Sequence, residues 1–543
     1  MMDDPGLIGG PSTEEGRDLG VVIGGSLSQG LDVRLTSPSV VEEAKVGTFV
    51  TVQGTVNRFF GIITDLSLES SDSRLASSIG SADPAMAEVL AGTGAFAQAR
   101  ITPMLTTGIT DAVPQPARSL PAHFAPVRRA SNDDVQAVFG TEDDRHVYIG
   151  SPLDMEDTRV CLDLGELVKR SNGVFGKSGS GKSFLTRILL ASILQRNVAT
   201  NLVFDMHSEY GWQGTSETGY AAKGLKQMFG NRVSVFSLDP ESDLRRGLSP
   251  DVEVRIGLDE IEPDDIATLA GTLNITEAGV NACHTLADKY GKQWISSFLS
   301  LDQEGMASLA AEGEHAGVLG ALRRKLRDLE RIGFVQAQAP SGGGAVRSVL
   351  DHLTDGKHVV MEFGRYGDDL TAYLLVANLI TRRIHEAYRK QTEQALATGG
   401  KPPAPLVITI EEAHRFLGEG IAGQTIFGTI AREMRKYHVT LLVVDQRPSG
   451  IDDEVLSQIG TRITCQLDND RDVDAVLRGA PGSRELRGVL SRLEAQQQAL
   501  IFGHALPMPV VVHTRDYDEF AAEMALPGRG RAAVGAGDKS DLF

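Results

Sequence analysis

The stretch Gly176-Lys177-Ser178-Gly179-Ser180-Gly181-Lys182-Ser183 determines the fold class of this 543-residue chain. It fits GxxxxGK followed by Ser or Thr, the pattern of a phosphate-binding loop (P-loop), and lies between an apolar stretch at 173–175 and a periodic apolar stretch at 183–194. Glycines let backbone N–H groups turn towards phosphate oxygens, and a following helix adds the partial positive charge of its N-terminus. All eight residues are therefore predicted to bind a nucleotide. The alternative is a glycine-rich turn without a ligand.

The last two residues of the loop have predicted chemical roles. Lys182 is expected to reach the β- and γ-phosphates of a nucleotide, and Ser183 to offer its hydroxyl to Mg²⁺. A GTPase would need an NKxD element and an ABC ATPase an LSGGQ signature, and the sequence contains neither. Both classes are therefore excluded, and Mg²⁺ is an expected cofactor together with the nucleotide.

Strand-like apolar stretches continue beyond the loop, at 201–205, 357–363, 406–410 and 440–444. Each lies near helical segments, and continuous apolar strands of this kind are typical of a parallel sheet that is buried on both faces. Between about 255 and 340 the pattern is helical instead. The sequence therefore predicts an α/β fold with a helical insertion.

Two acidic residues, Glu411 and Glu412, follow the apolar stretch at 406–410. In a Walker B element the first acid lies at the strand tip and orders Mg²⁺, and the second orients the water that attacks the γ-phosphate. Glu411 is therefore predicted to bind Mg²⁺ and Glu412 to be catalytic. The alternative is an acidic helix start, where the helix dipole favours carboxylates without any catalytic role.

Two more polar residues end predicted strands at the edge where ligands bind in open α/β folds. Gln446 follows the stretch at 440–444 and is predicted to sense the γ-phosphate; a turn residue before Arg-Pro is the alternative. Asp205 ends the stretch at 201–205 and is predicted to lie behind the metal-binding residues and orient them.

A predicted helix between these elements presents Arg432 and Arg435. In a ring of subunits such arginines could act as a finger that reaches a neighbour's γ-phosphate and stabilises charge in the transition state. They could equally be a solvated helix face, and their spacing does not decide between the two interpretations.

The amino-terminal region has a different pattern, with short β-rich stretches at 21–25, 48–56 and 59–66 that are separated by glycine. These strands are predicted to form a small β-barrel or a β-sandwich. The predicted organisation is a flexible arm at 1–17, the β-domain at 18–130, a first ATPase-core segment at 145–254, a helical insertion at 255–342, a second ATPase-core segment at 343–515 and a tail at 516–543.

Composition limits the remaining possibilities. The net charge is −19, from 53 basic and 72 acidic residues, so any nucleic acid must meet a local basic lining. The three cysteines are far apart and form no disulfide framework or zinc site. An acidic start without a signal peptide, and the lack of an apolar run long enough to cross a bilayer, predict a cytoplasmic protein that does not enter a membrane.

With these motifs the chain resembles the HerA family of hexameric ATPases, relatives of the FtsK translocases. The resemblance rests on the β-rich first domain, the P-loop, and four further stretches, Asp-Met-His-Ser-Glu-Tyr-Gly (205–211), Glu-Glu-Ala-His-Arg-Phe (411–416), Ala-Arg-Glu-Met-Arg-Lys-Tyr (431–437) and Asp-Gln-Arg-Pro-Ser (445–449). The chain departs from the family pattern where Glu411 replaces the more usual Asp, and where Asp445 replaces a small or hydroxyl residue.

The resemblance implies a RecA-like ATPase core behind a HAS-type barrel. It also implies a homohexamer that moves double-stranded DNA through its channel by ATP hydrolysis, in end resection and double-strand break repair with a NurA-type nuclease that docks on the barrel face. The resemblance also favours the interpretation that Arg432 or Arg435 is an arginine finger. The alternative within this resemblance is the ATPase subunit of an antiphage complex with a nuclease or sirtuin-like effector.

Overall fold

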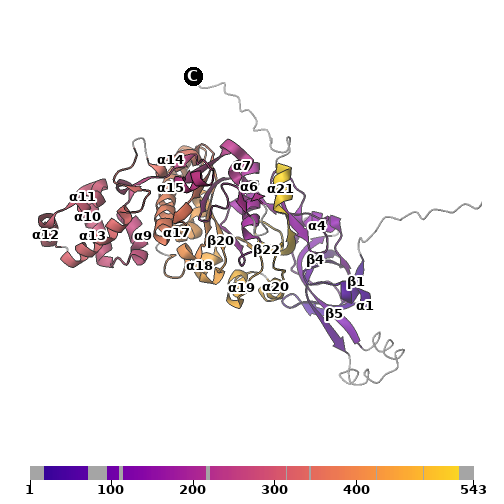
Figure 1. The fold of residues 1–543 in the computed structure, drawn as a ribbon. Helices are drawn as coiled ribbons and strands as arrows, with labels where there is room; N and C mark the ends of the chain where they lie inside the picture. The colour runs from indigo at the N-terminus through magenta and orange to yellow at the C-terminus, as the bar shows by residue number, and fades with distance from the viewer. Residues whose placement is uncertain are drawn as a thin grey trace, which may run out of the picture. The chain divides into compact units, whose positions relative to one another are not determined.

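The computed structural model describes residues 17–70, 95–108, 114–215, 221–313, 315–340, 344–422, 425–480 and 482–524. The chain divides into two compact units (Figure 1). Among the described residues, the first unit contains those within 1–162, 479–494 and 498–514, and the second contains those within 163–478, 495–497 and 515–524. Residues 479–494 and 498–514, which the sequence pattern places in the ATPase core, thus belong to the first unit, because they include a hairpin that pairs with strand β8 (His146–Pro152).

A six-stranded barrel forms the amino-terminal region of the first unit, as the β-rich pattern predicts. Its strands lie in the order β2-β1-β7-β3-β4-β5, and β2 (Gly30–Leu35) pairs with β5 (Ala95–Gly108) to close the ring. Along β2, Leu31, Val33 and Leu35 are buried in the barrel core and alternate with more exposed Asp32 and Arg34. This alternation is the pattern expected of a sheet that is closed around its own apolar face.

The other strands of the barrel and the remaining elements of the first unit have the following bounds. They are β1 (Asp18–Ser26), α1 (Pro38–Glu43), β3 (Phe49–Gln53), β4 (Asn57–Ser70), β6 (Gln115–Pro116), β7 (Pro126–Arg129), α4 (Asn132–Phe139), β9 (Val160–Asp163), α20 (Ser483–Leu490), β22 (Gln498–Gly503) and β23 (Val510–Thr514).

Eight parallel strands form the sheet of the second unit, in the order β15-β14-β18-β11-β19-β20-β10-β21. Every residue of β11 (Thr200–Asp205), β19 (Leu406–Glu411) and β20 (Val439–Asp445) is buried. Helix α6 (Lys182–Arg196) packs on β10 and β11, and α17 (Ile426–Glu433) packs on β20. Burial on both faces explains why these strands are continuous apolar runs.

The remaining elements of this unit complete the α/β core and its insertion. They are α5 (Leu164–Val168), β10 (Asn172–Phe175), β12 (Gly214–Thr215), β13 (Ala221–Ala222), α7 (Leu225–Phe229), β14 (Val233–Ser237), α8 (Pro240–Arg245), β15 (Val252–Glu253), β16 (Ile256–Gly257), α9 (Pro263–Leu273), α10 (Glu277–Tyr290), α11 (Trp294–Ser300), α12 (Gln303–Ala311), α13 (Ala316–Glu330), β17 (Val335–Gln336), α14 (Ala345–Thr354), β18 (His358–Glu362), α15 (Leu370–Thr398), α16 (His414–Leu417), α18 (Asp453–Ser457), β21 (Thr461–Thr464), α19 (Asp470–Leu477) and α21 (Tyr517–Met524).

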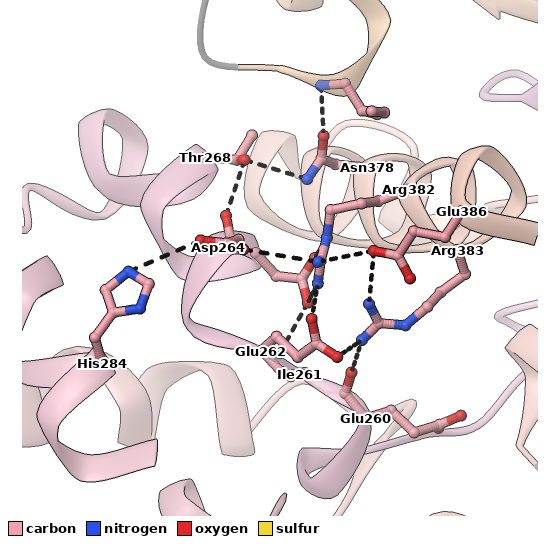
Figure 2. A network of polar contacts seen from close by, with 12 residues as sticks. Glu260, Ile261, Glu262, Asp264, Thr268, His284, Asn378, Arg382, Arg383 and Glu386 are labelled. Atoms are coloured by element: carbon pink, nitrogen blue, oxygen red, sulfur yellow. Dashed lines mark hydrogen bonds and ion pairs between the residues drawn. The ribbon is translucent and has the colours of Figure 1, made fainter. Parts of the chain in front are cut away.

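The predicted helical insertion is present as helices α9 to α13, which Figure 1 shows in one cluster to the side of the sheet. Figure 2 shows how α9 is attached to α15. Arg382 of α15 donates from Nε and Nη2 to the two carboxylate oxygens of Asp265, each at 3.0 Å, and pairs with Glu262 at 2.7 Å. Asp265 is 1% exposed, so this bidentate pair is a buried connection between the insertion and the core.

Within the described stretches of the chain, the helices include none that is both long and apolar enough to span a membrane.

Candidate active site

The strand register brings the predicted site residues to one edge of the second sheet. Phe175, which precedes the P-loop, is paired with Asp445 at the end of β20. Glu411 is paired with Val444, one residue before that end. Because parallel strands align their carboxyl ends, the P-loop, Glu411, Glu412 and Gln446 lie at a common edge, as the sequence predicts.

Three glycines of the P-loop have positive φ angles, 155° at Gly176, 76° at Gly179 and 95° at Gly181. A Cβ atom at Gly176 would lie 2.6 Å from Ser180 Oγ and 2.8 Å from Cys465 Cβ. Glycine is therefore required there both for its backbone angle and for space. Gly181 is the residue before α6, so the loop leads directly into a helix N-terminus.

Lys182 is the most buried cation of the loop, with 9% of its surface exposed. Its Nζ donates a hydrogen bond to the backbone oxygen of Lys177 at 2.7 Å. Burial lowers the pKa of the Lys182 ammonium, and the nearby acids Glu412, Asp445 and Glu209 partly oppose this shift. The arrangement holds a poorly solvated positive charge against the loop, as a phosphate-binding lysine requires.

The other loop residues have distinct environments. Ser180 Oγ donates to the Lys177 oxygen at 2.8 Å, and Lys177 Nζ pairs with Asp468 at 3.0 Å. The hydroxyl of the half-buried Ser183 makes no hydrogen bond with the described residues of the chain, which leaves its oxygen available to a cation. The backbone of Ser178 lies between these residues in the same loop.

The two glutamates of the predicted Walker B element have different surroundings. Glu411 is 6% exposed, and its carboxylate accepts hydrogen bonds from Tyr210 Oη at 3.1 Å and Met206 N at 3.3 Å. Burial raises the pKa of Glu411 well above its usual value, and repulsion from Asp205 adds to this shift. The Glu411 carboxylate is thus engaged by Met206 and Tyr210 of the segment that follows β11.

Glu412 instead lies near enough to Lys182 for its negative charge to raise the pKa of that ammonium, against the effect of burial. Its backbone has φ 47°, a left-handed conformation that costs about 1 to 3 kcal/mol in a residue other than glycine. Its Oε1 accepts a hydrogen bond from Gln446 Nε2 at 3.1 Å. The structure therefore brings together the predicted catalytic glutamate and the predicted γ-phosphate sensor, and it stores backbone strain at this point.

Asp205 holds the segment that follows β11. Its carboxylate accepts hydrogen bonds from the backbone N–H groups of Glu209 and Tyr210, both at 2.8 Å, and of Gly211 at 3.3 Å. Burial raises the pKa of Asp205 despite these donors. Because Tyr210 belongs to the segment and contacts Glu411, Asp205 positions a partner of the Walker B strand.

Sequence reasoning assigned no role to His414 or to Asp445. Asp445 Oδ2 lies 3.0 Å from Nδ1 of His414 and accepts a hydrogen bond from His414 N at 2.7 Å. The side-chain hydrogen bond with Asp445 raises the pKa of His414, although burial opposes the shift. The departure of Asp445 from the family pattern was the available signal, because a buried carboxylate at a strand tip needs a partner.

Arg432, a predicted finger, lies near the end of α17. It pairs with Glu454 of α18 at 3.1 Å and donates to the backbone oxygens of Gly428 at 3.1 Å and Ala422 at 3.4 Å. Its side chain is 29% exposed. The side chain of Arg435, the second predicted finger, lies outside what the structure describes, although its backbone continues the turn that follows α17.

A glycine-rich loop at a helix N-terminus, a buried lysine and a strand-tip glutamate paired with an amide define a P-loop ATPase. Residues 147–384 match the family model of the helicase HerA central domain, and residues 19–89 match the HAS barrel domain. The chain therefore belongs to the HerA family, and the resemblance found from its motifs is confirmed.

Two proteins named HerA agree with this assignment. The DNA double-strand break repair helicase HerA of Pyrococcus furiosus is 27% identical over 438 residues, which are 77% of this chain and 76% of that protein. The protein of the same name from Sulfurisphaera tokodaii is 26% identical over 425 residues, 75% of each chain. Among solved structures, the bacterial conjugative coupling protein TrwBdeltaN70 is similar with a TM-score of 0.47 and 13% identity, over 72% of this chain and 92% of that one.

Proposed function

We propose that this protein is a homohexameric motor that hydrolyses ATP with Mg²⁺ to move along double-stranded DNA, and that it acts in DNA end resection and double-strand break repair. The observation that carries the proposal is the hydrogen bond between Glu412 and Gln446 at the edge that also holds Lys182. The HerA relatives of Pyrococcus furiosus and Sulfurisphaera tokodaii are named DNA double-strand break repair helicases, which supports DNA as the substrate.

In the proposed reaction, the P-loop backbone holds the phosphates and Lys182 neutralises charge on the β- and γ-phosphates. Glu412 accepts a proton from the attacking water and orients it, and Gln446 contacts the γ-phosphate. The residues fit Mg²⁺ because the Ser183 hydroxyl is available, and when bound the ion neutralises phosphate charge. Glu411, which was predicted to share this ion, would first have to exchange its contacts with Tyr210 and Met206.

The hexamer is proposed because the sequence carries a single P-loop, and a ring lets each site be completed by a neighbour. Arg432 is the candidate for the group that acts in trans, and it would have to leave Glu454 to do so. DNA binding is compatible with the net charge of −19 because only phosphates within about 10 Å respond strongly to a basic channel. A NurA-type nuclease on the barrel is the proposed partner, and a DNA substrate would place the complex in the cytoplasm.

The test is the ATPase rate of the purified protein with and without linear duplex DNA at one fixed salt concentration. We expect DNA to stimulate the rate, and Glu412→Gln to lower hydrolysis to a small residual rate while ATP still binds. Lys182→Ala is the matched variant that should lose binding as well. A rate that does not respond to DNA would contradict translocation, and normal hydrolysis by Glu412→Gln would contradict the proposed role of Glu412.

A further inference from the structure

Asp445 connects three strand tips of the candidate active site. Its backbone oxygen accepts a hydrogen bond from Gly176 N at 3.3 Å, at the entry to the P-loop. Its carboxylate, whose side chain is 0% exposed, accepts hydrogen bonds from His414 N at 2.7 Å and Arg447 N at 2.6 Å, and lies 3.0 Å from His414 Nδ1. A buried carboxylate with this many donors is rigidly placed.

His414, which Asp445 holds in place, lies next to the Glu412 carboxylate. Its Nδ1 lies 3.6 Å from Glu412 Oε2, while Gln446 donates to the other carboxylate oxygen, Oε1. The two carboxylate oxygens of Glu412 are thus approached from two sides. A glutamate side chain has three rotatable torsions, so its carboxylate can point in many directions unless contacts restrict it. The contacts with His414 and Gln446 provide this restriction at a residue whose backbone is strained.

We propose that Asp445 and His414 are positioning residues for Glu412: Asp445 fixes the imidazole of His414, and His414 holds the Glu412 carboxylate in the direction needed to orient the attacking water. This inference rests on the proposed catalytic role of Glu412. An imidazole and two carboxylates within 4.8 Å of one another could also ligate a divalent cation. The positioning role is favoured because backbone N–H groups already occupy both oxygens of the Asp445 carboxylate.

The test compares His414→Ala, His414→Gln and Asp445→Asn in the full chain. Misplacement of the Glu412 carboxylate should lower kcat roughly 10- to 100-fold, and Kd for a fluorescent ATP analogue should change less than about 3-fold. His414→Gln should recover part of the lost kcat, because a glutamine amide N–H can donate to Asp445 or to Glu412. A purely structural role would lower nucleotide affinity and melting temperature together with kcat.

A double-mutant cycle separates this inference from the role of Glu412 itself. If His414 acts through Glu412, Glu412→Gln and Glu412→Gln/His414→Ala should have the same residual rate. A further loss in the double variant, or a wild-type kcat in His414→Ala, would overturn the positioning role. Normal hydrolysis by Glu412→Gln alone would overturn the proposed function instead. Asp445 is buried and its variant can misfold, so the conclusion rests on the partly exposed His414, whose side chain is 26% exposed.

Discussion

Nζ of Lys182 donates a hydrogen bond to the backbone oxygen of Lys177, 2.7 Å away and five residues earlier in the same loop. The ammonium therefore lies against the loop that is expected to surround the phosphates. A contact with an anionic phosphate oxygen is stronger than one with a neutral carbonyl, so a bound nucleotide would draw the ammonium away from Lys177. Because Lys182 is 9% exposed, its charge also lacks most of the solvation it would have in water.

Lys182→Ala should consequently lower ATP affinity by at least about tenfold without lowering the melting temperature, because removal of a buried charge also removes its desolvation cost. Titration calorimetry and thermal melting measure the two effects. Lys177→Ala is the matched control: its Nζ is paired with Asp468, and a P-loop residue at that position contacts phosphate through its backbone. Equal losses of affinity in the two variants would contradict the assignment of Lys182.

Glu362, at the end of β18, should make stability depend on pH. Burial raises its pKa to about 8 from the usual 4.5, and Asp205 and Asp243 add repulsion, although Arg246 opposes the shift. Between these two pH values the folded protein keeps a proton that the unfolded chain releases. The free energy of unfolding should therefore fall as pH rises from about 4.5 to about 8, by at most about 1.4 kcal/mol per pH unit.

Glu362→Gln should flatten this dependence, because the amide is neutral throughout. Urea-unfolding midpoints between pH 5 and 8, compared with those of the wild type, measure the change. Glu393→Gln, on the exposed surface of α15, is the control that should keep the wild-type slope. Parallel slopes for wild type and Glu362→Gln would show that Glu362 ionises normally.

The regions of the molecule that local sequence determines were predictable. The strand, loop and helix around Gly176–Ser183 follow from glycine spacing and apolar periodicity, and the barrel follows from alternating strands. The closing pair β2 and β5 could not be predicted, because nothing local selects a partner so far along the chain. The grouping of residues 498–514 with the first unit could not be predicted for a similar reason, since an apolar stretch does not reveal which strand it pairs with.

Within the site, the sequence predicted the P-loop residues and the proximity of Glu412 to Gln446. It did not predict that Glu411 accepts a hydrogen bond from Tyr210, about 200 residues earlier, because that contact depends on β11 lying next to β19. The link between His414 and Asp445 likewise depends on the register of β19 with β20. Strand order and register are therefore the information that the motifs lacked.

Arg382 should be necessary for the attachment of the helical insertion. Arg382→Ala would leave the nearly buried Asp265 without its bidentate partner, which typically costs about 3 kcal/mol or more. Arg382→Lys should recover little, because an ammonium cannot form the two parallel bonds. Hydrogen exchange of α9 amides measures the loosening. Arg389→Ala, whose pair with Glu393 on the same helix is exposed and 4.0 Å long, should change exchange very little.

The ion pair between Arg432 and Glu454 allows the proposed trans role of Arg432 to be separated from a structural one. If Arg432 contacts the γ-phosphate bound to a neighbouring subunit, its ion pair with Glu454 competes with that contact. Glu454→Gln should therefore leave the DNA-stimulated ATPase rate equal or higher. Arg432→Ala should lower the rate by at least about 10³-fold, the usual effect of losing an arginine finger. If the arginine only fastens α17 to α18, both variants should lower the melting temperature and the ATPase rate alike.

Mixed rings distinguish the two roles directly. Subunits with Lys182→Ala and subunits with Arg432→Ala are each expected to be inactive alone. Combined in one ring they should regain activity, because an intact P-loop can then meet an intact arginine across an interface. No recovery in mixed rings, with both proteins folded and assembled, would mean that Arg432 does not act across that interface.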